Sequence, residues 1–248
     1  MTEVETPNVA RMYNYYLGGD LHTPADRAAA AQAIAAVPET IAIVRENRRF
    51  LGRAVSFLAG DAGIDQFIDI GSGLPTEENV HEIAQRLSPS ARVVYADLDP
   101  YVVSQAQELL LGTQNVRFAE ADIRDPALVL ESSAVRELID LGRPVAVLCV
   151  AMLQFTTEPA AIVAYLRDRV PSGSFLVISH PVPRTAQAGS ISQIYTDLNF
   201  RTPEQVATLF DGWELVPPGI VSLHEWRNPD DDWDPAGAWF CCGVARKP

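Results

Sequence analysis

The fold of this chain is decided by the stretch Phe67-Ile68-Asp69-Ile70-Gly71-Ser72-Gly73-Leu74-Pro75-Thr76. A short apolar run with an acidic residue enters a glycine turn, and a helix-like segment, Glu77–Leu87, follows the turn. Glycine permits a positive φ and leaves no side chain between the main chain and a ligand. A strand, a glycine turn and a helix in this order predict a site of the kind that holds an adenosyl group in α/β proteins.

The chain around this turn alternates between strand-like and helix-like segments. The strand-like runs are Phe67–Ile70, Arg92–Ala96, Val116–Ala119, Val145–Ala151 and Phe175–Ser179. The helix-like segments between them are Glu77–Leu87, Tyr101–Leu111, Leu128–Leu138 and Ala160–Val170. This alternation is typical of βαβ units with a parallel sheet.

The C-terminal part departs from this pattern. After a helix-like segment at Pro203–Phe210, the runs Leu215–Leu223 and Trp239–Ala245 read as two strands joined by the polar loop Asn228–Pro235. We expect them to form an antiparallel hairpin at one edge of the sheet. The sequence therefore predicts an α/β fold with a Rossmann-like, seven-stranded, mostly parallel sheet and a C-terminal antiparallel hairpin.

The N-terminal part is helical in pattern. Helices are expected near Val9–Leu17, Ala25–Val37 and Glu39–Ala59. The pattern changes near Gly60–Gly63, so we expect an N-terminal helical cap or lid (1–62) and a cofactor-binding core (63–248) that forms one compact unit.

Composition and charge limit the partners of the chain. Its 248 residues are 48% hydrophobic and 21% charged, which is typical of a globular protein. The formal net charge of −13 argues against nucleic acid, whose phosphates favour surplus Lys and Arg. No apolar run approaches the ~20 residues that span a bilayer, and Met1–Ala10 lacks the apolar core of a signal peptide. We expect a cytoplasmic protein that binds neither nucleic acid nor membrane; its oligomeric state is left open.

The cysteines and histidines lack the spacing of metal ligands. Cys149, Cys241 and Cys242 lie in apolar, strand-like runs without a C-x-x-C pair, which predicts buried free thiols. The acidic run Asp230–Asp232 is expected to be a solvated loop rather than a calcium site. The sequence thus predicts no metal site.

Three successive strand-like runs have an acidic residue at or just beyond their carboxyl ends: Asp69, Asp97 and Asp122. In a doubly wound sheet, ligands bind across the carboxyl ends of the strands. Asp97 follows Gly73 by about 24 residues, close to the ~20 expected for a carboxylate that accepts hydrogen bonds from ribose hydroxyls. A plain turn former or helix N-cap is the alternative for each of the three.

The glycine turn differs from the dinucleotide fingerprint. That fingerprint, G-x-G-x-x-G, requires a glycine where this chain has Thr76. Asp69, two positions before the first glycine, suits a ligand with a cationic amino group better than a pyrophosphate. The turn and the strand-end carboxylates together favour such an adenosyl ligand over a dinucleotide.

These residues resemble the first motifs of class I S-adenosylmethionine-dependent methyltransferases, in which an acidic residue precedes x-G-x-G. The resemblance implies S-adenosylmethionine as the cofactor, with its methionine part beside the turn and its ribose hydroxyls on Asp97. It places the adenine beside Leu98, Ile123 and the Asp122 carboxylate. The cofactor-binding residues that it implies in the core are Asp69, Gly71, Ser72, Gly73, Asp97, Leu98, Asp122, Ile123, Ala151 and Met152.

A closer resemblance extends over nearly the whole chain. Residues 8–19, 70–76 and 79–82 read NVARMYNYYLGG, IGSGLPT and NVHE. They are similar to a bacterial, DUF574-like family of S-adenosylmethionine-dependent methyltransferases whose methyl acceptor is unknown. Many methyltransferases have a third glycine where this chain has Pro75, but Leu-Pro-Thr is the usual continuation in this family. The resemblance is specific for the cofactor and says little about the acceptor.

The N-terminal helices carry three more candidates for cofactor contact. Tyr15 and Tyr16 lie in a segment that commonly covers the cofactor in this superfamily, although a core position in an amphipathic helix also explains Tyr16. Gly18-Gly19 fits either a helix C-cap or a hinge for lid closure. Arg48 lies on the apolar stripe of its helix, where either the cofactor carboxylate or an internal Asp would be its partner.

Two histidines are candidate catalytic bases. His180 ends the fifth strand-like run, where a turn residue before Pro181 is the alternative, and His22 follows the glycines and would enter the cleft when a lid closes. A base is needed only for an acceptor that must lose a proton, because methyl transfer itself requires alignment of acceptor, methyl group and sulfur.

The sequence thus predicts an S-adenosylmethionine-dependent methyltransferase that acts on a small-molecule acceptor by in-line transfer. Two alternatives stay open: a non-catalytic S-adenosylmethionine-binding regulator and an NAD-dependent oxidoreductase on a related fold. The absent third glycine counts against the oxidoreductase.

Overall fold

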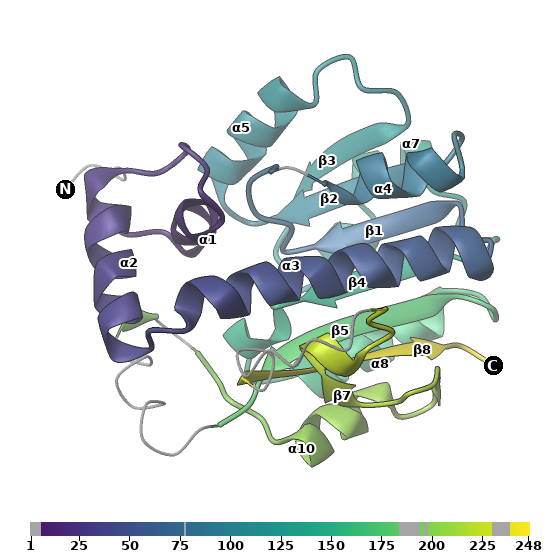
Figure 1. Cartoon of the computed structure of the whole chain (residues 1–248). Coiled ribbons are helices and arrows are strands. Elements are labelled where there is room, and N and C mark those ends of the chain that lie inside the picture. Colours follow the sequence, from purple (N-terminus) through teal and green to yellow (C-terminus); the bar gives the residue numbers. More distant parts are fainter. Residues whose placement is uncertain (1–5, 77, 184–193, 196–197, 230–238) are drawn as a thin grey trace.

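The computed structural model describes residues 6–76, 78–183, 194–195, 198–229 and 239–248. Within these residues an eight-stranded mixed sheet forms the centre of the molecule (Figure 1). Its strand order is β3-β2-β1-β4-β5-β8-β6, and β7 pairs with β8. The strands are β1 (Gln66–Ile70), β2 (Arg92–Asp97), β3 (Val116–Glu120), β4 (Ala146–Val150), β5 (Phe175–Pro181), β6 (Glu214–Leu215), β7 (Val221–Ser222) and β8 (Phe240–Arg246).

The parallel strands β1 to β5 make up most of the sheet, which confirms the predicted α/β class. The C-terminal strands are antiparallel as expected, with β8 inserted between β5 and β6. The described strands number eight rather than seven, because the run predicted as Leu215–Leu223 is two short strands. Pro217 and Pro218 lie between them and have no N–H to donate to a ladder, and Gly219 turns the chain with a φ of 91°. The loop that contains Asp230–Asp232 lies outside the described residues.

Most of the described helices begin where the sequence supplies a cap. They are α1 (Val9–Leu17), α2 (Pro24–Ala36), α3 (Thr40–Ser56), α4 (Val80–Leu87), α5 (Pro100–Leu109), α6 (Pro126–Leu130), α7 (Ser133–Leu138), α8 (Pro159–Arg169) and α10 (Pro203–Ala207). Proline follows a capping Asp or Thr at the start of α2, α5, α6 and α10, where its missing N–H costs nothing. The predicted helix Leu128–Leu138 is two helices, because the Ser132 hydroxyl accepts the Val135 N–H at 3.2 Å and caps α7.

The helix after the glycine turn starts later than the sequence predicts. α4 begins at Val80, and the predicted first residue, Glu77, lies outside the described residues. The Glu82 carboxylate accepts the Asn79 N–H at 2.7 Å and so caps the helix at this point. The turn after β1 is therefore longer and runs through Leu-Pro-Thr.

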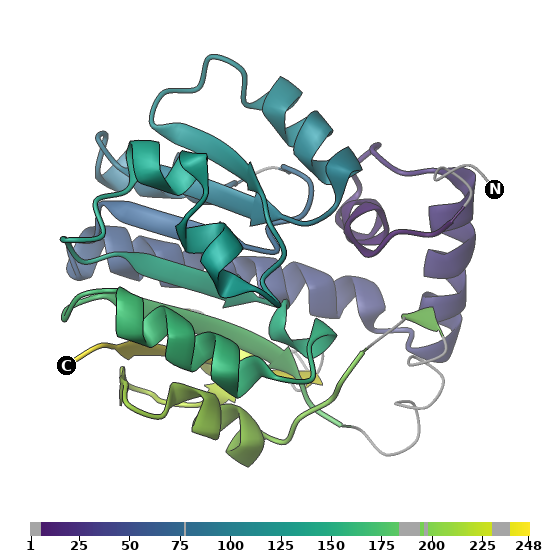
Figure 2. The ribbon, with the colours of Figure 1, turned by 180° about the vertical axis from the view of Figure 1, so that it is seen from behind.

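Helices cover both faces of the sheet. α3 and α4 lie on one face (Figure 1), and α6, α7, α8 and α10 lie on the other (Figure 2). Side chains alternate along β1, so Phe67 packs on the α3 side, whereas Ile68 and Ile70 pack on the opposite side. The same alternation directs Asp69 towards α3.

α3 packs against both the cap helices and the sheet. Its first half contributes Val44 to the apolar cluster of α1 and α2, and its second half contributes Phe50 and Val55 to the cluster on the sheet. The predicted division of the chain into residues 1–62 and 63–248 stays a prediction.

Two expectations from composition can be compared with the structure. Cys149, Cys241 and Cys242 are buried free thiols, as predicted. In the part of the chain that the structure describes, no single helix is both long and apolar enough to cross a membrane. Only α2 and Thr40–Asp61 taken together reach that length and composition, and they are bent by 99° relative to each other.

The helices α1 and α2 stand at the carboxyl ends of the parallel strands (Figure 1). The main-chain N–H of Asn8 donates to Asp26 at 2.8 Å, and the Asn8 side-chain amide donates to Asp99, which follows β2. The Arg11 guanidinium donates to the other Asp26 oxygen at 2.7 Å, and both side chains are buried. We call Asn8, Arg11, Asp26 and Asp99 the cap clasp, because they join α1 to α2 and to the sheet.

Removing Arg11 tests how much the cap clasp contributes to stability. Arg11→Ala is expected to lower the free energy of unfolding by about 3 kcal/mol, because the buried Asp26 carboxylate loses its charge partner. Urea unfolding followed by circular dichroism measures this loss. The control is Arg86→Ala, which removes the exposed partner of Glu78 and should cost less than about 1 kcal/mol. Equal losses in the two variants would contradict the anchoring role of the clasp.

Candidate cofactor and acceptor site

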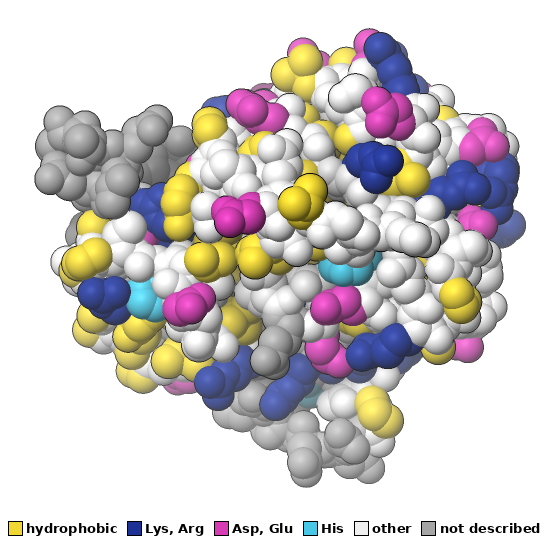
Figure 3. Space-filling model, turned by 90° about the horizontal axis from the view of Figure 1, so that it is seen from above, with side chains coloured by type: hydrophobic (Ala, Val, Ile, Leu, Met, Phe, Trp, Pro, Cys, Tyr) yellow, Lys and Arg dark blue, Asp and Glu magenta, His cyan; other side chains and the backbone are white. Residues whose placement is uncertain are grey.

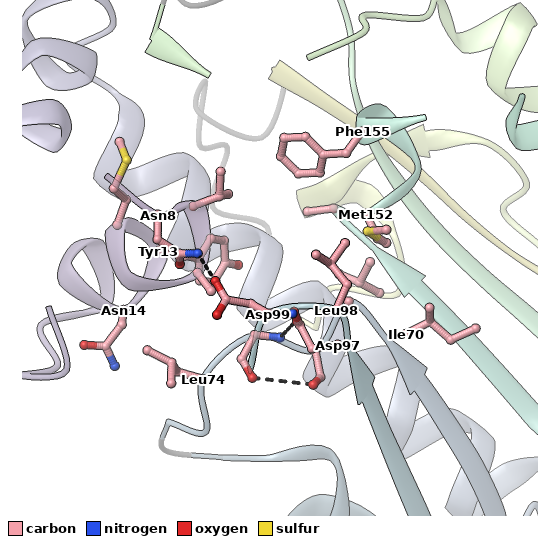
Figure 4. A pocket seen from close by; sticks show the side chains of 18 of the residues that line it. Asn8, Tyr13, Asn14, Ile70, Leu74, Asp97, Leu98, Asp99, Met152 and Phe155 are labelled. Atoms are coloured by element: carbon pink, nitrogen blue, oxygen red, sulfur yellow. Dashed lines mark hydrogen bonds between the residues drawn. The ribbon is translucent and has the colours of Figure 1, made fainter. Parts of the chain in front are cut away.

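A cavity of about 400 Å³ lies at the carboxyl ends of β1, β2 and β4. We call it the strand-end cavity. In Figure 4, Asn8 and Tyr13 of α1 face Met152 and Phe155 across it, and Asp97 lies at the end of its strand below them. The predicted cofactor residues that line it are Arg48, Asp69, Gly71, Ser72, Gly73, Asp97, Leu98, Ile123, Ala151 and Met152. The structure thus places most of the predicted cofactor residues around one cavity.

The turn after β1 favours glycine for two reasons. Gly71 and Gly73 have φ angles of 68° and 64°, which side chains disfavour. A Cβ on Gly71 would also lie 2.7 Å from the Met152 sulfur, so the Met152 side chain would have to shift. The Gly71 N–H donates to the Ala96 carbonyl at 2.8 Å and so ties the turn to the end of β2.

Asp97 lies at the point where β2 leaves the sheet. One of its carboxylate oxygens accepts the Gly73 N–H at 2.9 Å, and the other accepts the Asp99 N–H at 3.1 Å. Burial raises the pKa of Asp97, although these backbone hydrogen bonds oppose the shift. A carboxylate has about four acceptor positions, so Asp97 retains capacity for donors such as ribose hydroxyls.

Asp69 is a buried carboxyl group with 5% of its surface exposed. Burial raises the pKa of Asp69 to about 7; the nearby Arg48 guanidinium opposes this shift and Asp97 adds to it. Arg48 donates to the Glu78 carbonyl at 3.0 Å and to the Asn79 side chain at 3.4 Å, which holds it beside the turn. A cationic group in the cavity would favour the ionised form of Asp69.

A chain of buried hydrogen bonds crosses the wall between the cap and the sheet. The Ser179 hydroxyl donates to Asn47 Oδ1 at 2.6 Å and accepts the Ala151 N–H at 2.9 Å. The Asn47 amide donates to the Tyr13 hydroxyl at 3.0 Å, and that hydroxyl donates to the Val44 carbonyl at 3.3 Å. These bonds hold Ala151 in a left-handed conformation with a φ of 51°.

A second cavity of about 150 Å³ adjoins the first. We call it the aromatic pocket, because seven aromatic side chains line it: Tyr13, Tyr16, Phe155, Tyr195, Phe200, Trp239 and Phe240. Six residues line both cavities: Val9, Tyr13, Asn47, Ala151, Phe155 and Tyr195. A molecule in the aromatic pocket therefore shares a wall with whatever occupies the strand-end cavity.

Asp122 lies outside both cavity walls. Its carboxylate accepts hydrogen bonds of 2.8–3.0 Å from Arg124 and forms an ion pair with the Arg124 guanidinium at 2.6 Å; these contacts lower the pKa of Asp122. Its neighbours Ala121 and Ile123 line the strand-end cavity. The chain after β3 therefore turns Ile123, but not Asp122, towards the cavity, and a contact between Asp122 and adenine stays a prediction.

His180, the first candidate base, is fully buried and absent from both cavity walls. Its Nδ1–H donates to the Pro181 carbonyl at 2.9 Å, and its Nε2 accepts from Arg201 at 2.8 Å. Burial lowers the pKa of His180 to about 4. Because both ring nitrogens are engaged, this histidine contributes to packing in the observed arrangement, and nothing in it supports a role as base.

His22 and Tyr15 also lie outside both cavity walls. Their rings meet edge to face at 5.1 Å, and His22 Nδ1 lies 3.1 Å from Arg27. Tyr16 lines the aromatic pocket, and its hydroxyl lies 2.7 Å from that of Tyr195. Gly18 is the left-handed C-cap of α1, which confirms that alternative; its role as a hinge stays a prediction.

Sequence reasoning missed several residues of the two walls. Gln154 and Phe155 line a cavity but follow no motif, and Asn8 and Asn14 lie in the segment 8–19 without being predicted as site residues. One signal was available: Asn47 lies on the apolar stripe of α3, and a polar residue on a buried face needs a partner.

Comparison with known proteins identifies the family. Methyltransferases among the solved structures share this fold. One is NodS, an N-methyltransferase from Bradyrhizobium japonicum WM9 solved with S-adenosyl-L-homocysteine. It matches with a TM-score of 0.50 and 13% identity, covering 82% of this chain and 88% of that chain. At that identity the likeness shows the fold alone. The chain belongs to the S-adenosyl methyltransferase family, whose model matches residues 2–248.

Two solved structures are similar over nearly the whole chain. A candidate methyltransferase from Thermobifida fusca YX is 38% identical with a TM-score of 0.94, covering 99% of this chain and 96% of that chain. A DUF574 family protein from Streptomyces avermitilis MA-4680 is 38% identical with a TM-score of 0.93, covering 99% of both chains. No curated protein matches this chain. The resemblance drawn from the sequence motifs is confirmed.

The buried Asp69 carboxyl predicts a pH-dependent stability. Because its pKa of about 7 lies above the usual value of about 3.9, the folded state binds the proton more tightly, and stability falls as the pH rises between these values. Asp69→Asn is expected to remove this decline in urea unfolding between pH 5 and pH 8. Asp168→Asn, which changes an exposed carboxyl, is the control and should keep it.

The difference between the stability–pH profiles of Asp69→Asn and Asp168→Asn reports the ionisation of Asp69. Burial lowers the pKa values of His81 and His180, which makes stability rise with pH, but it does so equally in both variants. Identical profiles for Asp69→Asn and Asp168→Asn would show that Asp69 ionises normally.

Proposed function

We propose that this protein transfers the methyl group of S-adenosylmethionine to a small-molecule acceptor by in-line displacement. The observation that carries the proposal is the arrangement of two adjoining cavities: one lined by the strand-end carboxylates and the glycine turn, the other apolar and sharing its wall. Membership of the S-adenosyl methyltransferase family supports it.

The residues of the strand-end cavity suit the cofactor. Asp97 retains acceptor positions for the ribose hydroxyls, and Leu98 and Ile123 offer apolar surface beside the adenine. Asp69, which is buried, would gain a cationic partner in the ammonium group of the methionine part. Arg48 lies on the same side of the turn, where its guanidinium would hold the carboxylate.

The cofactor supplies an activated methyl group on a sulfonium, so the protein has to align and shield the reactants. Gly71 and Gly73 leave the main chain open beside the ligand, and the Met152 side chain closes the other side of the turn. The cap clasp holds α1 over the strand ends, where Tyr13 excludes water from the wall shared by the two cavities.

A small molecule suits the acceptor side better than a nucleic acid. The chain has a formal net charge of −13, and the face seen from above in Figure 3 has charged side chains of both signs interspersed with hydrophobic ones. A cytoplasmic location is part of the same proposal.

Two functions compete with this one. An NAD-dependent oxidoreductase would need a pyrophosphate at the turn, where Asp69 and Asp97 would repel it. A non-catalytic regulator would bind S-adenosylmethionine without turnover. The aromatic pocket favours the methyltransferase, since a regulator needs no acceptor site.

Binding measurements with Asp97 variants test the proposal. Asp97→Ala is expected to weaken S-adenosylhomocysteine binding by about 1–3 kcal/mol, because hydrogen bonds between the ribose and a charged group are lost. Isothermal titration calorimetry measures the affinity, and thermal unfolding checks that the variant is folded. The control is Glu120→Ala, which removes an exposed carboxylate paired in register with Asp97 on β3 and should bind normally.

The outcome separates the competing functions. Unchanged affinity in Asp97→Ala would remove Asp97 from the ribose site. Stabilisation by NAD and not by S-adenosylhomocysteine would replace the methyltransferase with the oxidoreductase. Tight S-adenosylmethionine binding without methylation of any compound in a metabolite extract, followed by mass spectrometry, would favour the regulator.

A further inference from the structure

The aromatic pocket has the size of one aromatic ring. Its volume is about 150 Å³, and an apolar cavity of ~150 Å³ is known to hold a benzene molecule. Flat side chains such as Phe155 and Phe240 line it together with the aliphatic Ile43 and Val44. Planar aromatic ligands stack on such walls with offset or edge-to-face contacts.

One polar atom in this wall lacks a partner. The Gln154 side chain is 4% exposed, and its amide donates to the Ala151 carbonyl at 2.6 Å. Its carbonyl oxygen, Oε1, is buried and accepts no hydrogen bond from any described residue. An unsatisfied buried acceptor is costly. Oε1 has almost no accessible surface, so a ligand donor would stabilise it once the Gln154 side chain turns towards the pocket.

The described residues of the aromatic pocket wall carry no charged side chain. None of its described residues is Asp, Glu, Lys, Arg or His. The Tyr16 and Tyr195 hydroxyls lie 2.7 Å apart, and the Tyr13 hydroxyl donates to the Val44 carbonyl. A charged ligand would lose its hydration without compensation, and an acceptor that must lose a proton before attack finds no base among these side chains.

From the size of the pocket, the unpaired Gln154 oxygen and the wall without described charges, we propose that the methyl acceptor is an uncharged aromatic amine of about one ring. It binds in the aromatic pocket, where a rotation of the Gln154 side chain brings Oε1 to its N–H. The inference rests on the proposed methyltransferase function and names its substrate class. An amine fits better than a phenol, because its nitrogen lone pair is available without prior loss of a proton.

The reaction balances without a base in the pocket. The nitrogen lone pair forms the new N–CH₃ bond while the S–CH₃ bond breaks, and its electron pair returns to sulfur. The products are S-adenosylhomocysteine and an N-methylammonium ion, which releases its proton to solvent.

Binding of simple probes to the protein saturated with S-adenosylhomocysteine tests the inference. Aniline is expected to bind at least about tenfold more tightly than benzoate, which is anionic, or cyclohexylamine, which is cationic and not planar. Calorimetry measures all three, and mass spectrometry looks for N-methylaniline when S-adenosylmethionine replaces the product. Preferred binding of benzoate or cyclohexylamine would overturn the inference.

A variant of Gln154 tests the hydrogen bond. Gln154→Met is expected to weaken aniline binding about tenfold, since one buried hydrogen bond is lost. Toluene has the same shape and no donor, so its affinity should not change. The matched control is Gln85→Met, which removes an amide that donates to main-chain carbonyls far from both cavities and should bind aniline normally. Equal loss of toluene and aniline in Gln154→Met would overturn the hydrogen bond.

A second variant covers the case in which Gln154→Met does not fold. Val44→Phe places a ring in the aromatic pocket and is expected to abolish aniline binding while S-adenosylhomocysteine still binds. Undiminished aniline binding would place the acceptor elsewhere. The two proposals fail differently: absent S-adenosylhomocysteine binding in the wild type would remove the methyltransferase function itself, whereas intact binding without aniline selectivity would remove only the substrate class.

Discussion

A hydrogen bond of 2.6 Å from Ser179 to Asn47 joins α3 to the end of β5 at the wall that the two cavities share. From this point polar contacts run in both directions, to the main chain of Ala151 after β4 and to Tyr13 on α1. Buried polar groups are costly unless each has a partner, so every member of this chain holds the next in place. The placement of α1 over the strand ends and the left-handed conformation of Ala151 both depend on it.

The sequence predicts best those parts of the site whose backbone admits few residue types. The positive φ of Gly71 and its close approach to Met152 strongly favour glycine, so the turn can be recognised from the sequence. The places of Asp69 and Asp97 follow from sheet geometry, because parallel strands bring their carboxyl ends to one edge and side chains alternate along each strand. The α/β class agrees with the structure, although α4 starts later than predicted and the segment Leu128–Leu138 is divided between two helices.

Other features depend on tertiary contacts that leave no local pattern. The chain after β3 brings Ile123 into the cavity wall and leaves Asp122 paired with Arg124, and a strand-end motif does not distinguish these two outcomes. His180 lies within β5. Its side chain is buried and contacts Arg201, so it does not line the cleft. Gln154 belongs to a short helical turn that becomes part of a wall only when α1, α3 and β8 surround it.

The two cavities differ in the charged side chains that line them. Asp69, Asp97, Asp99 and Arg48 all line the strand-end cavity, whereas the described wall of the aromatic pocket is neutral. Moving a charged group from water into an apolar pocket is costly unless an opposite charge or hydrogen bonds compensate. A zwitterionic ligand is therefore directed to the strand-end cavity, and an uncharged one is favoured in the pocket. For the proposed in-line transfer the two ligands need only meet at the shared wall. The pocket would then select a substrate as much by excluding charge as by binding a ring.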